Sequence, residues 1–343
     1  MITLTSLREP ASRERLFSNQ PELRRSLILA ALDSAGKPVT RVDTDSLASG
    51  LDKAAELGVV TPDMLDMLRT AHDQFVADTA AGTCDPEFTS DETQEGDGLV
   101  PYFFTRIRPE NDASLYQRLA WHATDASTPV YGDTVKVLEA DSAVVCRAAA
   151  LACEQRHASL YVLTTQPGHH AAADRFGGYC FVNWVVLLVK LLERSDRTPF
   201  VLDVDYHAGD GTAELLGASQ MVSLHCREDY PYRPADDPWA ISLPRQTDWK
   251  GYEPKLREAL ARQPADCDVL VVSLGVDTLA GDPDSRPGHG LGLEIADFGR
   301  MGSVVRGAGL QVLVVQEGGY HLPEVSGAVL AFCNALCGPH ARA

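Results

Sequence analysis

Short apolar runs along the chain predict buried β-strands. They span residues 161–165, 200–205, 221–225, 269–275 and 311–316. Continuous hydrophobicity over such lengths is typical of strands that are buried on both faces of a parallel sheet. Around these runs, apolar residues recur at helical spacing over 133–155, 183–194, 253–262, 294–307 and 324–336. The alternation predicts an α/β protein with a mostly parallel central sheet and helices on both faces.

The first 130 residues are less regular. Helical spacing predicts helices over 22–32 and 62–78. The segment 81–98 contains acidic residues but no basic residue, which predicts a solvated loop, with a lid or an oligomer contact as the alternative. Since no linker rich in Ser and Pro divides the chain, we expect one domain over residues 1–343, with an elaborated N-terminal segment over about 1–130.

Composition and charge exclude several classes of protein. The 343 residues are 45% hydrophobic and 23% charged, an ordinary globular balance that argues against disorder. Lys and Arg number 30 against 48 Asp and Glu, so the formal net charge is −18. A field of this sign repels phosphate backbones and attracts cations. We therefore expect no nucleic acid partner, and a cationic small molecule becomes a candidate ligand.

The sequence has neither a recognisable targeting signal nor a cysteine motif typical of redox or metal sites. The N-terminus lacks the features of a secretory signal, and no apolar stretch is long enough to span a bilayer. The eight cysteines never occur as Cys-x-x-Cys, and several lie in apolar runs. These observations predict a soluble, cytoplasmic protein without a membrane partner, disulfides or a cysteine metal site.

Polar residues follow four of the predicted strands, where ligands bind in an open parallel sheet. In chain order they are His169 and His170, then Asp203, Asp205, His207 and Asp210, then Asp277, and finally Tyr320. Any one of these groups alone is more often a turn, a cap or a packed side chain than a functional residue. Their shared position at strand ends favours a single catalytic site.

The Asp205-x-His207 spacing suits a metal ion. In an extended segment, residues two apart point to the same side, so both side chains can hold one ion, and Asp277 can supply a third ligand. Two carboxylates and one imidazole leave a four-coordinate zinc ion one open position, as in catalytic sites. The mixed oxygen and nitrogen set also suits Fe(II).

The adjacent His169 and His170 provide a base and an acid, which hydrolysis needs for the attacking water and for the leaving amine. Asp203 and Asp210 are candidate orienting partners for the two imidazoles. Tyr320 follows two glycines and can donate its hydroxyl to an oxyanion. Together these residues predict metal-assisted amide hydrolysis.

Six motifs, in order, resemble the signature set of the histone deacetylase and acetylpolyamine amidohydrolase superfamily. They are Pro167-Gly-His-His-Ala171, Gly177-Gly-Tyr-Cys-Phe-Val-Asn183, the run from Leu202 to Thr212, Ser223-Leu-His225, the run from Ser273 to Pro283, and Glu317-Gly-Gly-Tyr320. The resemblance implies the single-domain arginase/deacetylase fold. It also implies a zinc-dependent deacetylase that cleaves linear amides.

The resemblance assigns roles residue by residue. The implied zinc ligands are Asp205, His207 and Asp277, and the implied catalytic residues are His169, His170, Tyr320, Asp203 and Asp210. A structural potassium ion is implied near the zinc, at Asp203, Asp205, His207, Ser223 and Leu224. Tyr179 and Tyr230, together with Gly178, match the walls of the acyl-lysine tunnel.

Similarity is closest to the bacterial acetylpolyamine branch. Asp284 matches the position of an acidic entrance residue in a polyamine-selective relative, and Asp125 is a second candidate for binding the amine. An ordinary solvated acid is the alternative for both. We therefore expect hydrolysis of N-acetylpolyamines to polyamine and acetate. The alternatives are a protein deacetylase acting on acetyl-lysine and a non-catalytic binder of acetylated ligands.

Relatives in this branch often form homodimers in which an inserted loop narrows the tunnel entrance. The region through Arg108 is the matching segment here. The resemblance therefore implies a homodimer whose entrance admits slender amines and excludes folded proteins.

Overall fold

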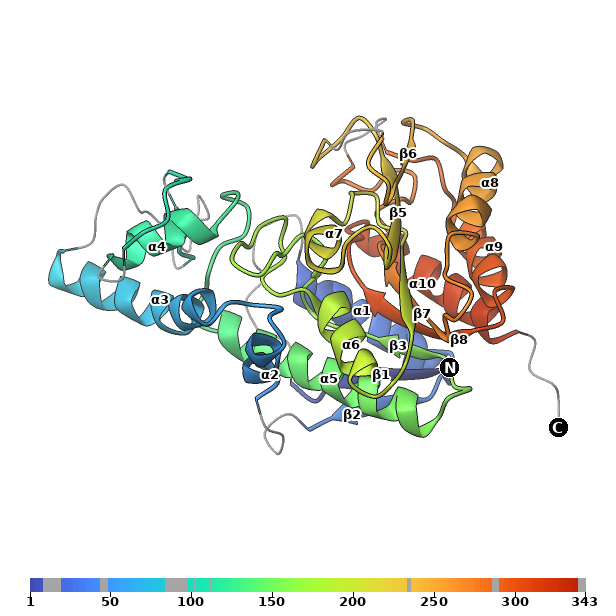
Figure 1. Cartoon of the computed structure of the whole chain (residues 1–343), viewed down its shortest axis with the longest axis horizontal. Coiled ribbons are helices and arrows are strands. Elements are labelled where there is room, and N and C mark those ends of the chain that lie inside the picture. Colours follow the sequence, from blue (N-terminus) through green and yellow to red (C-terminus); the bar gives the residue numbers. More distant parts are fainter. Residues whose placement is uncertain are drawn as a thin grey trace.

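The computed structural model describes residues 1–8, 20–43, 49–83, 98–101, 103–110, 113–232, 236–285 and 290–338. Most of the segment expected to be an acidic loop, residues 84–97, lies outside this set. Among the described residues, eight parallel strands form one sheet with the order β2-β1-β3-β8-β7-β4-β5-β6 (Figure 1). The strands are β1 (Ile2–Ser6), β2 (Val39–Val42), β3 (Leu160–Val162), β4 (Pro199–Asp203), β5 (Met221–Cys226), β6 (Ala240–Leu243), β7 (Val269–Leu274) and β8 (Gln311–Gln316).

Helices cover both faces of the sheet (Figure 1). Along the chain they are α1 (Pro21–Ser34), α2 (Gly50–Glu56), α3 (Pro62–Ala81), α4 (Leu115–His122), α5 (Thr134–Glu154), α6 (Trp184–Glu193), α7 (Asp210–Leu216), α8 (Trp249–Leu260), α9 (Ile295–Arg306) and α10 (Leu322–Cys337). The apolar faces of α5 and α6 belong to the core on one side, and those of α1, α8, α9 and α10 to the core on the other.

Strand β7 shows why the central strands are apolar throughout. Val269 and Val271 belong to the core with α5 and α6, whereas Leu270 and Val272 belong to the opposite core. Successive side chains of a strand point to opposite faces, so a strand covered on both sides needs an apolar residue at every position. Each such side chain, fully buried, contributes about 1.5–3 kcal/mol through the hydrophobic effect.

The predicted α/β fold is confirmed, and each of the five apolar runs overlaps a strand, although β3 ends at Val162 and β4 at Asp203, before the predicted ends. The sequence pattern missed β1, β2 and β6. Strands β2 and β6 lie at the two edges of the sheet, and the exposed Thr40 and Arg41 of β2 break its apolar pattern. Strand β1 is buried but carries Thr3 and Thr5, so it is not a continuous apolar run.

The N-terminal region contributes both to the central sheet and to a part outside it. Residues of β1 and β2 are part of the central sheet, and α1 packs against α10. Helices α3 and α4, by contrast, project from the sheet as an arm (Figure 1). No helix among the described residues is long and apolar enough to cross a membrane.

Candidate active site

A cavity of about 320 Å³ opens at the carboxyl ends of the central strands. Its walls include many residues that the sequence singled out: His169, His170, Asp205, His207, Tyr320, Gly178, Tyr179, Tyr230, Asp284 and Asp125. Strands β3, β8, β7 and β4 are neighbours in the sheet, so the loops that follow them meet at one edge. The sheet order thus brings together residues that are up to 195 positions apart in the chain, from Asp125 to Tyr320.

Asp205, His207 and Asp277 form a group that can hold a metal ion, with ligand atoms within 4.8 Å of one another. His207 Nδ1 lies 3.3 Å from Asp205 Oδ1 and 3.2 Å from Asp277 Oδ2. Both carboxylates are fully buried, and Asp277 Oδ2 has no hydrogen-bond partner. Two buried carboxylates with an orphaned oxygen are costly unless a cation joins them, so the donor set fits a divalent metal.

The electrostatics of this group show the same need for a cation. Burial and the neighbouring Asp205 raise the pKa of Asp277 to about 8. Burial opposes ionisation of Asp205 as well, but His169 and His207 outweigh it and lower the pKa of that carboxyl. A divalent ion would stabilise both carboxylates in their charged form.

Two glycines allow the strand ends to approach these carboxylates. A Cβ atom at Gly275 would lie 2.1 Å from Asp205 Oδ2, and one at Gly318 would lie 2.5 Å from Asp277 Oδ2. No side chain fits at either position without displacing a candidate metal ligand. Gly318 also donates its backbone N–H to Asp205 Oδ2 at 2.9 Å.

Each histidine of the adjacent pair has its own carboxylate. His169 Nδ1 lies 3.0 Å from Asp203 Oδ2, and His170 Nδ1 lies 2.8 Å from Asp210 Oδ1. Asp203 is the last residue of β4, and Asp210 is the first residue of α7. The predicted orienting partners therefore contact the imidazoles, one each, and leave the Nε2 atoms for chemistry.

The surroundings of the two imidazoles shift their pKa values in opposite directions. Burial alone would lower the pKa of His169, but Asp205, Asp203 and Glu317 outweigh burial and raise it to about 10. Burial and the neighbouring His169 lower the pKa of His170, against the opposing effect of Asp210. The carboxylates around His169 thus favour its charged form, and the surroundings of His170 favour its neutral form.

Tyr320 lies in the same cavity, with its ring edge-on to that of Tyr179 at a centroid distance of 5.6 Å. Burial raises its pKa well above the usual range of a phenol, so the hydroxyl remains protonated and can donate a hydrogen bond. On the other wall, the ring of Tyr230 lies 5.0 Å from that of His170. The two predicted tunnel residues, Tyr179 and Tyr230, therefore both line the cavity.

Gly178 and Tyr179 both adopt positive φ angles, of 56° and 67°. A Cβ atom at Gly178 would lie 2.5 Å from His170 Cδ2, so this turn packs directly against the His170 imidazole.

Asp284 and Asp125, the two candidate amine-binding acids, differ in their contacts. Asp284 accepts a hydrogen bond from the Tyr179 hydroxyl at 3.2 Å, and its other oxygen lies 3.9 Å from His207 Nε2. Asp125 Oδ1 accepts three bonds from Ser127 and Thr128, and its Oδ2 accepts the Gly178 N–H. Asp125 therefore holds the turn that carries Tyr179, whereas Asp284 faces the cavity.

The positions implied for potassium are also close together. Asp203 and Ser223 are paired in the parallel register of β4 and β5, and both are fully buried, as is Leu224. Asp203 precedes Asp205 by two residues, and Ser223 and Leu224 belong to the neighbouring strand β5.

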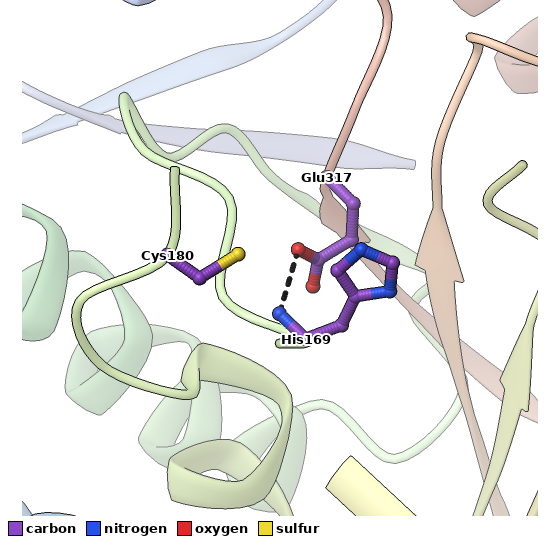
Figure 2. A group of neighbouring side chains, drawn as sticks. All are labelled: His169, Cys180 and Glu317. Atoms are coloured by element: carbon purple, nitrogen blue, oxygen red, sulfur yellow. Dashed lines mark hydrogen bonds between the residues drawn. The ribbon is translucent and has the colours of Figure 1, made fainter. Parts of the chain in front are cut away.

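A second group with potential metal ligands consists of His169, Cys180 and Glu317 (Figure 2). Glu317 Oε2 accepts the backbone N–H groups of Gly168 and His169 at 2.6 and 3.1 Å, and its Oε1 accepts the Ser273 hydroxyl. The Cys180 thiol donates to Gly178, and burial raises its pKa well above the usual range. These atoms are already engaged, so we interpret the group as a hydrogen-bonded support of the histidine loop.

The sequence reasoning assigned no role to Glu317 or Asp282. Both are fully buried acids, and each lies in one of the six motifs, within three positions of a candidate site residue. An acidic residue inside a motif is the signal that the sequence offers, but the partners of Glu317 are remote in sequence. Glu317 contacts residues about 150 positions away.

Comparison with known proteins agrees with this arrangement. The family profile for the histone deacetylase domain matches residues 67–336. Acetylpolyamine amidohydrolase 2 of Pseudomonas aeruginosa is 33% identical over 238 residues, which cover 64% of this chain and 68% of that protein. Histone deacetylase 8 of Arabidopsis thaliana is 34% identical over 191 residues, 47% of this chain and 49% of that protein.

A solved structure of an acetylpolyamine aminohydrolase from Burkholderia pseudomallei superimposes with a TM-score of 0.78. The match covers 98% of this chain and 99% of that one at 24% identity, and it shows that the fold is shared. The extent of the family match and the likeness of the fold lead to one conclusion: the chain belongs to the histone deacetylase family of hydrolases.

Proposed function

We propose that this protein hydrolyses N-acetylated cationic amines, N-acetylpolyamines in particular, to the free amine and acetate. The observation that carries the proposal is the carboxylate of Asp284, which faces the cavity between Tyr179 and His207. No Lys or Arg lies among the described residues that line this cavity. A protonated amine would therefore find a negative partner there and no competing cation.

Asp205, His207 and Asp277 are the residues that would hold the metal ion, with zinc as the proposed metal and Fe(II) as the alternative. When bound, such an ion acts as a Lewis acid toward the amide carbonyl and the attacking water.

The chain's own residues then move the protons. His170, which is neutral at pH 7, accepts a proton from the attacking water, and Asp210 keeps its ring in place. His170 then gives this proton to the leaving amine nitrogen, and the charged form of His169 stabilises the negative charge that develops beside it. The Tyr320 hydroxyl donates to the carbonyl oxygen as it becomes an oxyanion.

A structural potassium ion, a cytoplasmic location and a homodimer complete the proposal. The buried Asp203 and Ser223, in register with each other, support the ion.

Phe104 and Ile107, which are 48% and 81% exposed on the segment before α4, support a dimer contact. Light scattering should report twice 37.1 kDa for the wild type and a monomer for Ile107→Asp, and a wild-type monomer would exclude the dimer.

The substrate class is tested by kcat/KM of metal-reconstituted protein on N-acetylputrescine, N-acetylcadaverine, acetylspermidines and an acetyl-lysine peptide. We expect the free cationic amines to be the better substrates. If the peptide has the higher kcat/KM, the polyamine assignment is wrong and the second candidate, an acetyl-lysine deacetylase, takes its place. The similarity to histone deacetylase 8 of Arabidopsis thaliana is what favours that candidate.

A non-catalytic binder of acetylated ligands is the remaining alternative. Tyr320→Phe removes the oxyanion donor and keeps the ring, so it should lower kcat about 100-fold or more, as loss of one oxyanion donor does. Hydrolysis by this variant at the wild-type rate would contradict the proposed mechanism.

A further inference from the structure

Asp282 lies between two loops that have different tasks in the proposed reaction. Its side chain is fully buried, and both of its oxygens accept backbone hydrogen bonds. Oδ2 accepts the N–H groups of Tyr320 and His321 at 2.7 and 2.9 Å. Oδ1 accepts the N–H group of Asp284 at 3.0 Å. One carboxylate therefore holds the backbone of the oxyanion donor and that of the acid at the cavity entrance.

The two ends of this bridge lie far apart in the sequence. Tyr320 follows β8, and Asp284 lies in the loop between β7 and α9. Within the part of the chain that the structure describes, the oxygens of Asp284 face the Tyr179 hydroxyl and His207 Nε2. Backbone N–H groups aimed at a buried carboxylate make charge-assisted hydrogen bonds, which are stronger than neutral ones.

We propose that Asp282 is a positioning residue that couples selectivity for a cationic substrate to catalysis, by holding Asp284 and Tyr320 with the two oxygens of one carboxylate. This inference rests on the proposed function, since it takes Asp284 as the partner of the substrate amine. Asp282 itself does not line the cavity. It acts only through the residues that it holds.

The geometry predicts an unequal effect of Asp282→Asn. An asparagine side chain has one acceptor oxygen and one donor NH2 group, so it cannot accept bonds on both sides. The Tyr320 side offers two N–H donors, and the Asp284 side offers one. The amide oxygen should therefore remain with Tyr320, and the NH2 group should oppose the N–H of Asp284. The substitution should displace the entrance acid and spare the oxyanion donor.

The test compares two substrates of the same length. N-acetylputrescine carries an ammonium group, and N-pentylacetamide carries a methyl group in its place. The ratio of their kcat/KM values measures selectivity for the cation, and kcat on the neutral amide measures the chemistry. The variants are Asp282→Asn, Asp284→Asn and their double mutant.

Asp297→Asn is the matched control. Asp297 is also a buried aspartate, 5% exposed, that accepts a backbone N–H, from Glu294 at 3.0 Å, but it belongs to α9 and does not line the cavity. Asp282→Asn and Asp297→Asn are the same chemical change in two buried settings. Only the former should alter selectivity.

We expect Asp284→Asn and Asp282→Asn each to lower the selectivity ratio about fivefold, the scale of one partly exposed charge pair. The double mutant should resemble the single mutants, since both act on the same contact. Asp282→Asn should keep kcat on the neutral amide within about threefold of the wild type. Asp297→Asn should leave the ratio unchanged.

Two results would overturn the inference in different ways. A wild-type selectivity ratio in Asp282→Asn, with reduced kcat on both substrates, would show that Asp282 does not act on Asp284. A wild type that does not prefer the cation would overturn the proposed substrate class, and the inference with it. If Asp282→Asn does not fold, Asp282→Ser provides the same test, because it keeps one acceptor oxygen without burying an amide.

Discussion

The Tyr179 hydroxyl donates a hydrogen bond to Asp284 Oδ1 at 3.2 Å and thereby joins an aromatic wall of the cavity to its entrance acid. Removing this donor tests whether the orientation of Asp284 matters. Tyr179→Phe keeps the ring and its contact with Tyr320 but frees the carboxylate to rotate. We expect kcat/KM for N-acetylputrescine to fall about three- to tenfold, the scale of one ordinary hydrogen bond. An unchanged kcat/KM would show that this contact has no part in recognition.

The carboxylate of Asp210 is expected to control both the rate and its pH dependence. Asp210→Asn removes the carboxylate that orients His170, so kcat should fall about 10- to 100-fold, as for loss of a partner that orients a histidine at a metal site. Asp210 also raises the pKa of His170, so its loss lowers that pKa further. The base then stays neutral to lower pH, and the acid limb of the kcat/KM profile should move to lower pH. A shift of this limb to higher pH would contradict the assignment of His170 as the base.

Removal of the metal ion should destabilise the protein as well as inactivate it. Without a cation, the buried carboxylates of Asp205 and Asp277 repel each other, and the pKa of Asp277 is raised. A ligand present at 100 times its Kd stabilises the folded state by about 2.7 kcal/mol. Treatment with a chelator should therefore lower Tm, and added zinc should restore both Tm and activity. Asp277→Asn, which lacks one candidate ligand, is the control, and its Tm should respond less to the chelator and to zinc. Equal Tm values of the wild type with and without metal would contradict the site.

Gly318→Ala tests the close approach of the loop after β8 to the metal ligands. The added Cβ would lie 2.5 Å from Asp277 Oδ2 and 2.7 Å from Asp205 Oδ2, so the ligands must move. We expect lower zinc content and a loss of activity of about 100-fold or more, because small misplacements at a catalytic centre cost that much. Gly299→Ala in α9 is the matched control. Its Cβ meets nothing closer than 3.6 Å, so the helix should gain about 0.5–1 kcal/mol and activity should not change. Normal zinc content in Gly318→Ala would refute the predicted crowding.

The central strands and the order of the motifs could be predicted from the sequence because their signals are local. An apolar run such as 269–275 is readable without its neighbours. Asp205 and His207 stand two residues apart directly after such a run, although β4 ends at Asp203 and the two residues lie beyond the strand. Strand β1 could not be found in this way. Its threonines are buried only because the fold covers the faces of the strand, as where Arg25 of α1 donates to the Thr5 hydroxyl.

The residues for a metal ion, two imidazoles and an oxyanion donor are thus already evident in the chain, because each belongs to a short motif beside a strand end. The division of work among the acids depends on tertiary structure. Asp125 and Asp284 are equivalent candidates in the sequence. In the fold, the oxygens of Asp125 accept hydrogen bonds from its own turn and from Gly178, whereas those of Asp284 face the cavity. Asp282 and Glu317 acquire their partners only when loops after β3, β7 and β8 meet. A hydrogen bond requires its donor and acceptor within about 3 Å, and for residues so distant in sequence only the packed sheet brings them that close.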